Sequence, residues 1–191
     1  MKSVKSVALA VLFFALSSSA LAGKMKEIDS AIVASPDKAT IVFLRPGSFV
    51  GAAVAVPVFE VSESEVVFAG LVDAGSKFAH VVAPGEHLLA TTVFGGQAGV
   101  RLYKVNVEAG KIYYFRARII EGIWGLEPIH SSALSSSEFK KWNEGTDNTV
   151  NSEKTIAWGK GNLANVTARI RQAETSATFS EKNSLSLSDG I

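Results

Sequence analysis

The sequence contains no cysteine, and this absence excludes several kinds of chemistry. A chain without cysteine has no disulfide bond, no thiolate nucleophile and no thiolate ligand for a metal ion. It also lacks the sulfur to which bacterial lipoproteins attach their acyl chains. We therefore expect a protein without disulfide bonds that is not a lipoprotein. As a separate expectation, we predict no cofactor.

A strong charge of either sign is also missing. The chain has 19 basic and 18 acidic residues, which gives a formal net charge of +1. Without the N-terminal Lys2 and Lys5, seventeen basic residues face eighteen acidic ones. Nucleic-acid-binding domains usually carry a clear basic excess, so we expect no nucleic acid among the partners.

The N-terminal segment has the pattern of an export signal. Lys2 and Lys5 give a basic start, residues 7–16 are apolar, and Ala20 and Ala22 supply small side chains before a cleavage site. We predict a signal peptide at residues 1–22, cut between Ala22 and Gly23. A membrane anchor is the alternative, but ten apolar residues cover only about half of the roughly 30 Å of hydrocarbon. In a bacterium the product would be periplasmic or secreted, with no stable membrane anchor.

The 169 residues that follow the predicted signal suit one domain with a single core. We expect a lead-in at residues 23–36, a β domain at 37–122, an extension with a short helix at 123–145 and a polar, largely disordered tail at 146–191. Between Lys38 and Glu121, apolar residues recur with period two or in short runs separated by Gly, Pro and charged residues. This pattern predicts an all-β, antiparallel sandwich of about seven strands. The candidate strands are 39–44, 52–61, 66–72, 77–83, 87–94, 100–107 and 112–120.

The last two candidate strands are separated by Glu108-Ala109-Gly110, which suits a three-residue hairpin loop. Such a loop pairs Val105 with Tyr113 and Tyr103 with Phe115. It predicts an inward face made by Tyr103, Val105, Tyr113, Phe115, Ala117 and Ile119.

The opposite face of this hairpin is the first candidate binding surface. It gathers Lys104, Tyr114, Arg116 and Arg118, with Val100 and Leu102 opposite the arginines. Arginine binds carboxylate or phosphate through two parallel hydrogen bonds, and tyrosine can stack on a sugar. The alternative is that these long basic side chains simply cover a solvated sheet.

After the sheet, the residues around Ser135 have the features of a helix start. Ser135 and Glu138 suit a capping box, and Leu134 can pack against Phe139. The helix should end near Gly145, with Phe139 and Trp142 covering one end of the sandwich. In the polar tail, Leu163, Val166 and Ile170 lie at helical spacing with Asn162 as a possible cap, and we expect disorder from residue 174.

Two histidines suggest a second candidate site. His80 and His87 flank Pro84-Gly85, and a tight hairpin with Ala83 opposite Glu86 would place both imidazoles on one face. Two histidines make half a metal site, so a third ligand would come from His130 or Asp73. The glycine-rich residues 95–99 suggest a mobile turn. The serines form neither a Gly-x-Ser-x-Gly elbow nor a Ser-x-x-Lys frame, so the sequence shows no hydrolase motif.

Four short motifs resemble a bacterial envelope family, the domain of unknown function 2846. They are the run from Asp37 to Pro46 (DKATIVFLRP), Phe68 to Leu71 (FAGL), Gly75 to His80 (GSKFAH) and Pro84 to His87 (PGEH). The resemblance implies a compact β-sandwich of the PEGA type, often exported and often lipidated, with no established activity to carry over. This chain departs from the lipidated members by lacking the acceptor cysteine. We expect Arg45, before Pro46, to pair with a carboxylate at the sandwich edge.

These features together predict an exported, non-enzymatic β-sandwich that binds another component of the cell envelope, either a protein or a glycan. The binding residues would be Lys104, Tyr114, Arg116 and Arg118. The alternative is a periplasmic hydrolase or a metal-binding protein that uses His80 and His87.

Overall fold

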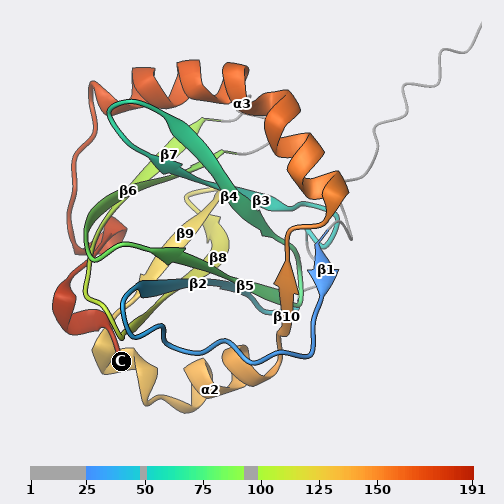
Figure 1. Cartoon of the computed structure of the whole chain (residues 1–191), viewed down its shortest axis with the longest axis vertical. Helices are drawn as coiled ribbons and strands as arrows, with labels where there is room; N and C mark the ends of the chain where they lie inside the picture. Colours follow the sequence, from blue (N-terminus) through green and yellow to red (C-terminus); the bar gives the residue numbers. More distant parts are fainter. Residues whose placement is uncertain (1–24, 48–50, 93–98) are drawn as a thin grey trace, which may run out of the picture.

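A computed structural model describes residues 25–47, 51–92 and 99–191. Within these residues the chain forms eleven strands in two stacked sheets, with helices outside them (Figure 1). The all-β sandwich with C-terminal helix predicted from the sequence is confirmed. The predicted signal peptide and its cleavage site at Ala22 and Gly23 lie outside the described residues.

The two sheets differ in strand order. Sheet A runs β1-β10-β5-β2-β8-β9 and sheet B runs β11-β7-β6-β3-β4. The strands are β1 (Lys26–Glu27), β2 (Ala39–Arg45), β3 (Val56–Val61), β4 (Val66–Val72), β5 (Ser76–Val82), β6 (Gly85–Thr92), β7 (Val100–Val107), β8 (Ile112–Ile120), β9 (Ile123–Ile129), β10 (Asp147–Val150) and β11 (Ser184–Leu185). The helices are α1 (Ser131–Leu134), α2 (Ser137–Glu144), α3 (Glu153–Glu174), η2 (Glu181–Asn183) and η3 (Leu187–Asp189).

The main hydrophobic core lies between the inner faces of the sheets. Alternate residues of each strand point into it, as the period-two pattern requires. The ring centroid of Phe43 on β2 lies 5.1 Å from that of Phe78 on β5 and 5.8 Å from that of Phe115 on β8. This aromatic stack belongs to sheet A, and side chains of sheet B such as Val58 and Val105 close the core from the other side.

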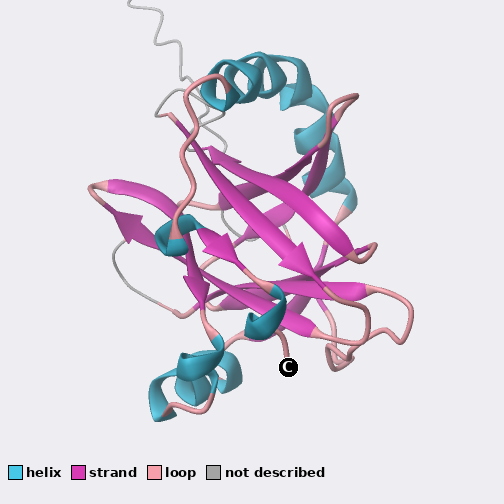
Figure 2. Ribbon diagram, turned by 90° about the vertical axis from the view of Figure 1, so that its left-hand side faces the viewer, coloured by secondary structure: helices cyan, strands magenta, loops and turns pink. Residues whose placement is uncertain are grey.

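Each sheet also has a covered outer face, so the molecule has four layers. Val166 and Ile170 of α3 pack on Phe59 and Leu102 of sheet B. Phe139 of α2 packs on Tyr114 of sheet A, with ring centroids 4.9 Å apart. Figure 2 shows the long helix at one end of this stack and shorter helical segments beside it and at the other end. In the described part of the chain, no helix is long and apolar enough to cross a membrane.

The C-terminal part differs from the largely disordered tail that we predicted. The spacing of Leu163, Val166 and Ile170 indicated a helix, but α3 begins at Glu153, nine residues before Asn162. The side chain of its N-cap, Ser152, accepts a hydrogen bond from the Thr155 amide. Residues beyond α3 are also paired, because β11 joins β7 and the backbone of Ile191 exchanges hydrogen bonds of 2.8 and 3.1 Å with Ile112. Packing on sheet B supplies the tertiary support that a polar helix needs.

The predicted hairpin between residues 100–107 and 112–120 is wrong. Its two strands lie in different sheets, with β7 beside β6 and β8 between β2 and β9, so the loop at Gly110 crosses from sheet B to sheet A. Five of the six predicted inward residues are nevertheless buried in the core, and Tyr103 meets Phe115 edge-on at 5.7 Å across it. The exception is Ile119, which is 43% exposed. Alternation fixed the face of each strand, but it could not identify the neighbouring strand.

Smaller differences concern element boundaries. Ser136, not Ser135, caps α2, because its side chain accepts from the Phe139 amide. The extension at 123–145 contributes a full strand, β9. Three pairings are parallel, namely β2 with β8, β5 with β10 and β7 with β11, within a sandwich that we expected to be antiparallel. Two of these pairings come from short C-terminal strands that return to the sheets.

Candidate functional site

The candidate site is a pocket at the point where β2 ends and β8 continues. The pairing of these strands stops at Leu44 and Arg116, whereas β8 continues to Ile120 alongside β9. The cavity has a volume of about 380 Å³, within the range of small-ligand sites. Its described lining consists of Arg45, Pro46, Gly47, Arg116, Ala117, Arg118, Ile119, Trp124 and Trp142.

Arg45 forms the inner wall of the pocket and is 1% exposed. Its guanidinium donates to the carbonyl oxygens of Gly51, at 2.6 Å, and Val54, and it lies 4.0 Å from the ring centroid of Trp124. Burial lowers the pKa of Arg45, while the charge of Asp73 acts in the opposite direction. The hydrogen bonds of Arg45 therefore go to backbone carbonyls, where we expected a carboxylate. Its Nε is buried and has no hydrogen-bond partner among the described residues.

Arg116 and Arg118 form the outer wall and share one carboxylate. Arg116 donates to Oε2 of Glu127 through Nε at 2.9 Å and Nη2 at 2.6 Å, and Arg118 Nη1 donates to Oε1 at 2.8 Å. The guanidinium of Arg116 also lies 3.8 Å from the ring centroid of Trp142 on α2. Glu127 stands opposite Arg116 in the register of β8 and β9, which explains why this ion pair forms.

The chemistry of this pocket suits an anionic group next to an apolar one. Three arginines line it, and none of its described lining residues is acidic. Arginine recognises carboxylate and phosphate through parallel hydrogen bonds. The two indole rings hold the guanidinium groups of Arg45 and Arg116 by cation–π contact, which limits the freedom that these arginines would lose on binding.

The predicted surface of Lys104, Tyr114, Arg116 and Arg118 is only partly assembled in the structure. Arg116 and Arg118 line the pocket, but Lys104 lies on sheet B and pairs with Glu86 at 3.0 Å. Tyr114 is buried beneath Phe139 of α2. Val100 and Leu102, predicted opposite the arginines, pack beneath α3 instead. These separations follow from the crossing between sheets at Gly110.

The histidines predicted as a second site meet a residue that we did not predict, Glu60. His80 Nε2 lies 2.7 Å from Glu60 Oε2, and His87 Nδ1 lies 2.7 Å from Glu60 Oε1. His87 Nε2 lies 2.8 Å from the carbonyl oxygen of Ala83. The side chains are 18%, 26% and 14% exposed for His80, Glu60 and His87. We call these three residues the His–Glu–His cluster.

The hydrogen bonds of the His–Glu–His cluster indicate which of its groups are charged. Both ring nitrogens of His87 face oxygen acceptors, an arrangement that favours the doubly protonated, charged ring over the neutral one. Hydrogen bonds from His80 and His87 lower the pKa of Glu60 to about 2, and the bond to Glu60 raises the pKa of His87. The carboxylate therefore has a donor on each oxygen. Within the described residues, no group of three or more acidic or histidine side chains is arranged to hold a metal ion.

The structure corrects the geometry proposed for these histidines. His80 is on β5 in sheet A and His87 is on β6 in sheet B, so they are not neighbours across a tight hairpin. Neither His130 nor Asp73 joins them as a third ligand. His130 Nδ1 lies 3.2 Å from Asp189 Oδ1 and its Nε2 lies 3.0 Å from the Glu181 carbonyl oxygen, which ties β9 to the C-terminal segment.

The period-two pattern of β3 indicated that Glu60 points toward the core, but the prediction from the sequence did not use this information. Val56 and Val58 face the core, so Glu60 on the same strand faces inward too. A carboxylate at an inward position needs a buried partner. Arg45 and Trp124 were missed for a different reason, since they approach each other only because β2 and β9 flank β8. Of the predicted glycine-rich turn at 95–99, residues 95–98 lie outside the described residues.

Comparison with known proteins gives no relative from which a function could be transferred: no protein-family model matches the chain, and no curated protein matches it. The functional argument therefore rests on the two clusters described above.

Proposed function

We propose that this protein is an exported, non-enzymatic β-sandwich that binds another component of the cell envelope through the pocket of Arg45, Arg116 and Arg118. The observation that carries the proposal is the lining of this cavity: three arginines and two tryptophans around about 380 Å³. The expected ligand group is an anion carried by a larger molecule.

Export and family membership belong to the same proposal. Export is supported by the basic start, the apolar run and the small residues of positions 1–22. Membership in the envelope family, domain of unknown function 2846, is supported by the four motifs between Asp37 and His87. Binding without catalysis is part of the proposal because His80 and His87 are both engaged with Glu60.

The test is crosslinking in cells with a tagged protein, followed by mass spectrometry of the captured material. We expect one defined envelope component to be captured by the wild type and lost in the double variant Arg116→Glu/Arg118→Glu. The matched control is Lys154→Glu/Lys160→Glu, which makes the same change of charge on exposed positions of α3. Equal capture by both double variants would contradict the site.

A further inference from the structure

The pocket coincides with an open strand edge in sheet A. β2 ends at Arg45, and β8 continues for four residues beyond its last pairing with β2, at Arg116. In the described part of the chain, no strand lies beside residues 117–120 on the β2 side; their partner β9 is on the other side. An edge of this kind offers backbone N–H and C=O groups to an added strand.

Side chains on the two faces of this edge differ in chemistry. Arg116 and Arg118 point to the outer face, where Trp142 of α2 lies against Arg116. Ala117 and Ile119 point to the inner face, where Ile119 stands opposite Trp124 in the register with β9. A strand laid beside β8 would thus meet cationic groups on one face and apolar groups on the other.

We propose that an extended, acidic segment of a partner protein adds to sheet A beside residues 117–120, in the line that β2 leaves open. Its acidic side chains contact Arg116 and Arg118, and the apolar side chains between them contact Ile119 and Trp124. This inference rests on the proposed binding function and specifies its partner as a protein. The recognised pattern is an alternation of acidic and apolar residues over about four positions, roughly 13 Å of strand.

An added strand would pair with the backbone N–H and C=O groups of the open edge, which a carboxylated glycan would not use. Backbone hydrogen bonds along an open edge supply affinity, and alternate side chains supply specificity. A sugar acid would use the arginines and could stack on an indole ring, but it would leave the backbone groups of the open edge unpaired. Strand addition also explains why cationic side chains line the outer part of the pocket while Ile119, although on the inner face of β8, is 43% exposed.

Glu127 is an internal competitor for the partner's carboxylates. It holds Arg116 and Arg118 through three contacts of 2.6 to 2.9 Å, the arrangement that an incoming acidic side chain would adopt. Glu127→Gln removes the charge of this competitor and keeps its shape, which weakens its hold on both guanidinium groups, although Arg116 still has the more distant Glu138 at 3.9 Å. We therefore expect tighter binding in this variant, by about tenfold, which corresponds to one charge-assisted hydrogen bond of about 1.4 kcal/mol.

The test measures fluorescence anisotropy of a labelled, capped pentapeptide of alternating glutamate and valine with the purified protein. The control peptide has the same sequence with N-methylated valines, which keep every charge but remove two backbone donors. We expect the methylated peptide to bind at least about tenfold more weakly. We also expect slower hydrogen exchange at residues 117–120 when the unmodified peptide binds.

The protein variants complete the test. Glu127→Gln should bind the peptide more tightly, and Arg116→Glu/Arg118→Glu should not bind it, with thermal unfolding measured for both to show that they fold. Equal affinity for the two peptides, or binding of oligogalacturonate and of neither peptide, would overturn the inference. A third outcome is that neither peptide binds while capture in cells still depends on Arg116 and Arg118. This result would overturn the inference that the partner is an extended acidic protein segment, and the proposed binding function would stand.

Discussion

The His–Glu–His cluster and the arginine pocket differ in how their charges are satisfied. In the cluster, each oxygen of Glu60 accepts from one histidine, and both nitrogens of His87 face acceptors. In the pocket, Glu127 holds two of three guanidinium groups, and the buried Nε of Arg45 has no hydrogen-bond partner among the described residues. A closed set of internal partners stabilises a fold, whereas Arg118, whose side chain is 47% exposed, keeps N–H donors that a ligand can reach.

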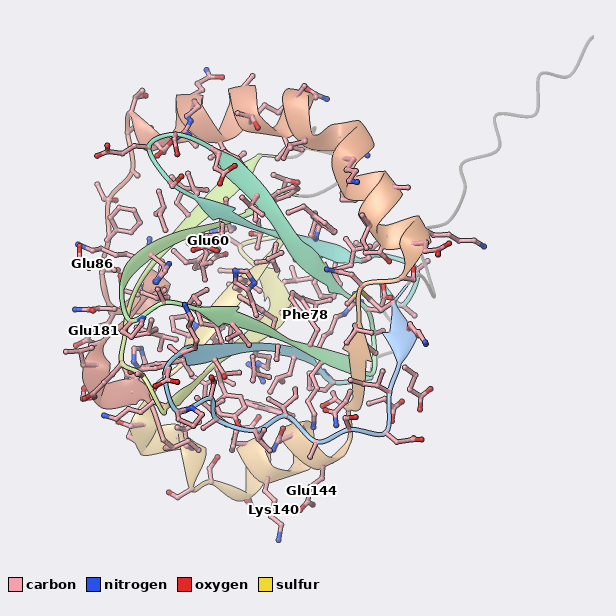
Figure 3. All side chains as sticks on the ribbon, viewed as in Figure 1. Glu60, Phe78, Glu86, Lys140, Glu144 and Glu181 are labelled. Atoms are coloured by element: carbon pink, nitrogen blue, oxygen red, sulfur yellow. The ribbon has the colours of Figure 1, made fainter. Side chains whose placement is uncertain are left out.

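Their positions in the fold agree with this contrast. The cluster joins the sheets from inside, since His80 belongs to sheet A and Glu60 and His87 belong to sheet B. Figure 3 shows Glu60 and Phe78 within the stack of strands, whereas Glu86, Lys140, Glu144 and Glu181 lie at the periphery. The pocket opens at the end of β2. We therefore expect substitutions in the cluster to change stability and substitutions in the pocket to change binding.

The largest effect on stability is expected for Glu60→Gln. An amide has an acceptor oxygen on one side only and carries no charge, so it cannot offer a separate oxygen to each histidine or balance the charge of a protonated His87. We expect the free energy of unfolding to fall by about 2–3 kcal/mol, because a charged acceptor is lost in a site that is mostly buried. Urea denaturation at pH 6 measures this change.

Glu86→Gln provides the matched control for that substitution. Glu86 lies on β6 next to His87, but its side chain is 63% exposed and pairs only with the exposed Lys104 at 3.0 Å among the described residues. Surface pairs of this kind contribute little to stability. Equal destabilisation by the two substitutions would contradict the structural role of the cluster.

A smaller effect is expected from pH, and stability should fall on both the acidic and the alkaline side of a maximum. The pKa of Glu60 is lowered to about 2, so its contribution is complete above the unfolded value of about 4.3 and is lost as the pH falls through about 2. The pKa of His87 is raised, so its contribution is complete below about 6.5 and is lost as the pH rises through the folded value. Stability should thus be highest between about pH 4.5 and 6.5.

The substitution His87→Gln distinguishes the acidic from the alkaline decrease in stability. The variant should lose the alkaline decrease in stability that His87 causes, while the acid decrease remains because Glu60 and His80 are still present. Thermal unfolding between pH 3 and 9 measures both limbs. An alkaline decrease as steep as that of the wild type would show that another group is responsible.

The sequence predicted the faces of the strands better than their neighbours. Tyr103 and Phe115 were placed in the core correctly, because burial follows from alternation along one strand. Their pairing was wrong, because the choice between a hairpin and a crossing to the other sheet depends on contacts distant in sequence. The arginine pocket has the same origin: Arg45, Arg116 and Trp124 meet only after β2, β8 and β9 are ordered in one sheet.

Local sequence was also a weak guide to α3. Its Gly159 is unfavourable in a helix by about 1 kcal/mol relative to alanine, which argues against a long helix. In the structure Gly159 packs against the ring of Phe68, where a Cβ would collide. The glycine therefore allows close contact between helix and sheet, a reason that a helix propensity does not include.

The smallest effect is expected for Lys104→Glu, and it tests the corrected surface directly. If the hairpin predicted from the sequence were correct, Lys104 would share a face with Arg116 and Arg118. Reversing the charge of Lys104 would then weaken binding of the envelope component. In the structure it lies on sheet B beside the exposed Glu86, away from the pocket lining. We expect capture of the envelope component to be unchanged and the free energy of unfolding to shift by no more than about 1 kcal/mol. Loss of capture in this variant would move the binding surface to sheet B, and the division between a structural cluster and a binding pocket would then fail.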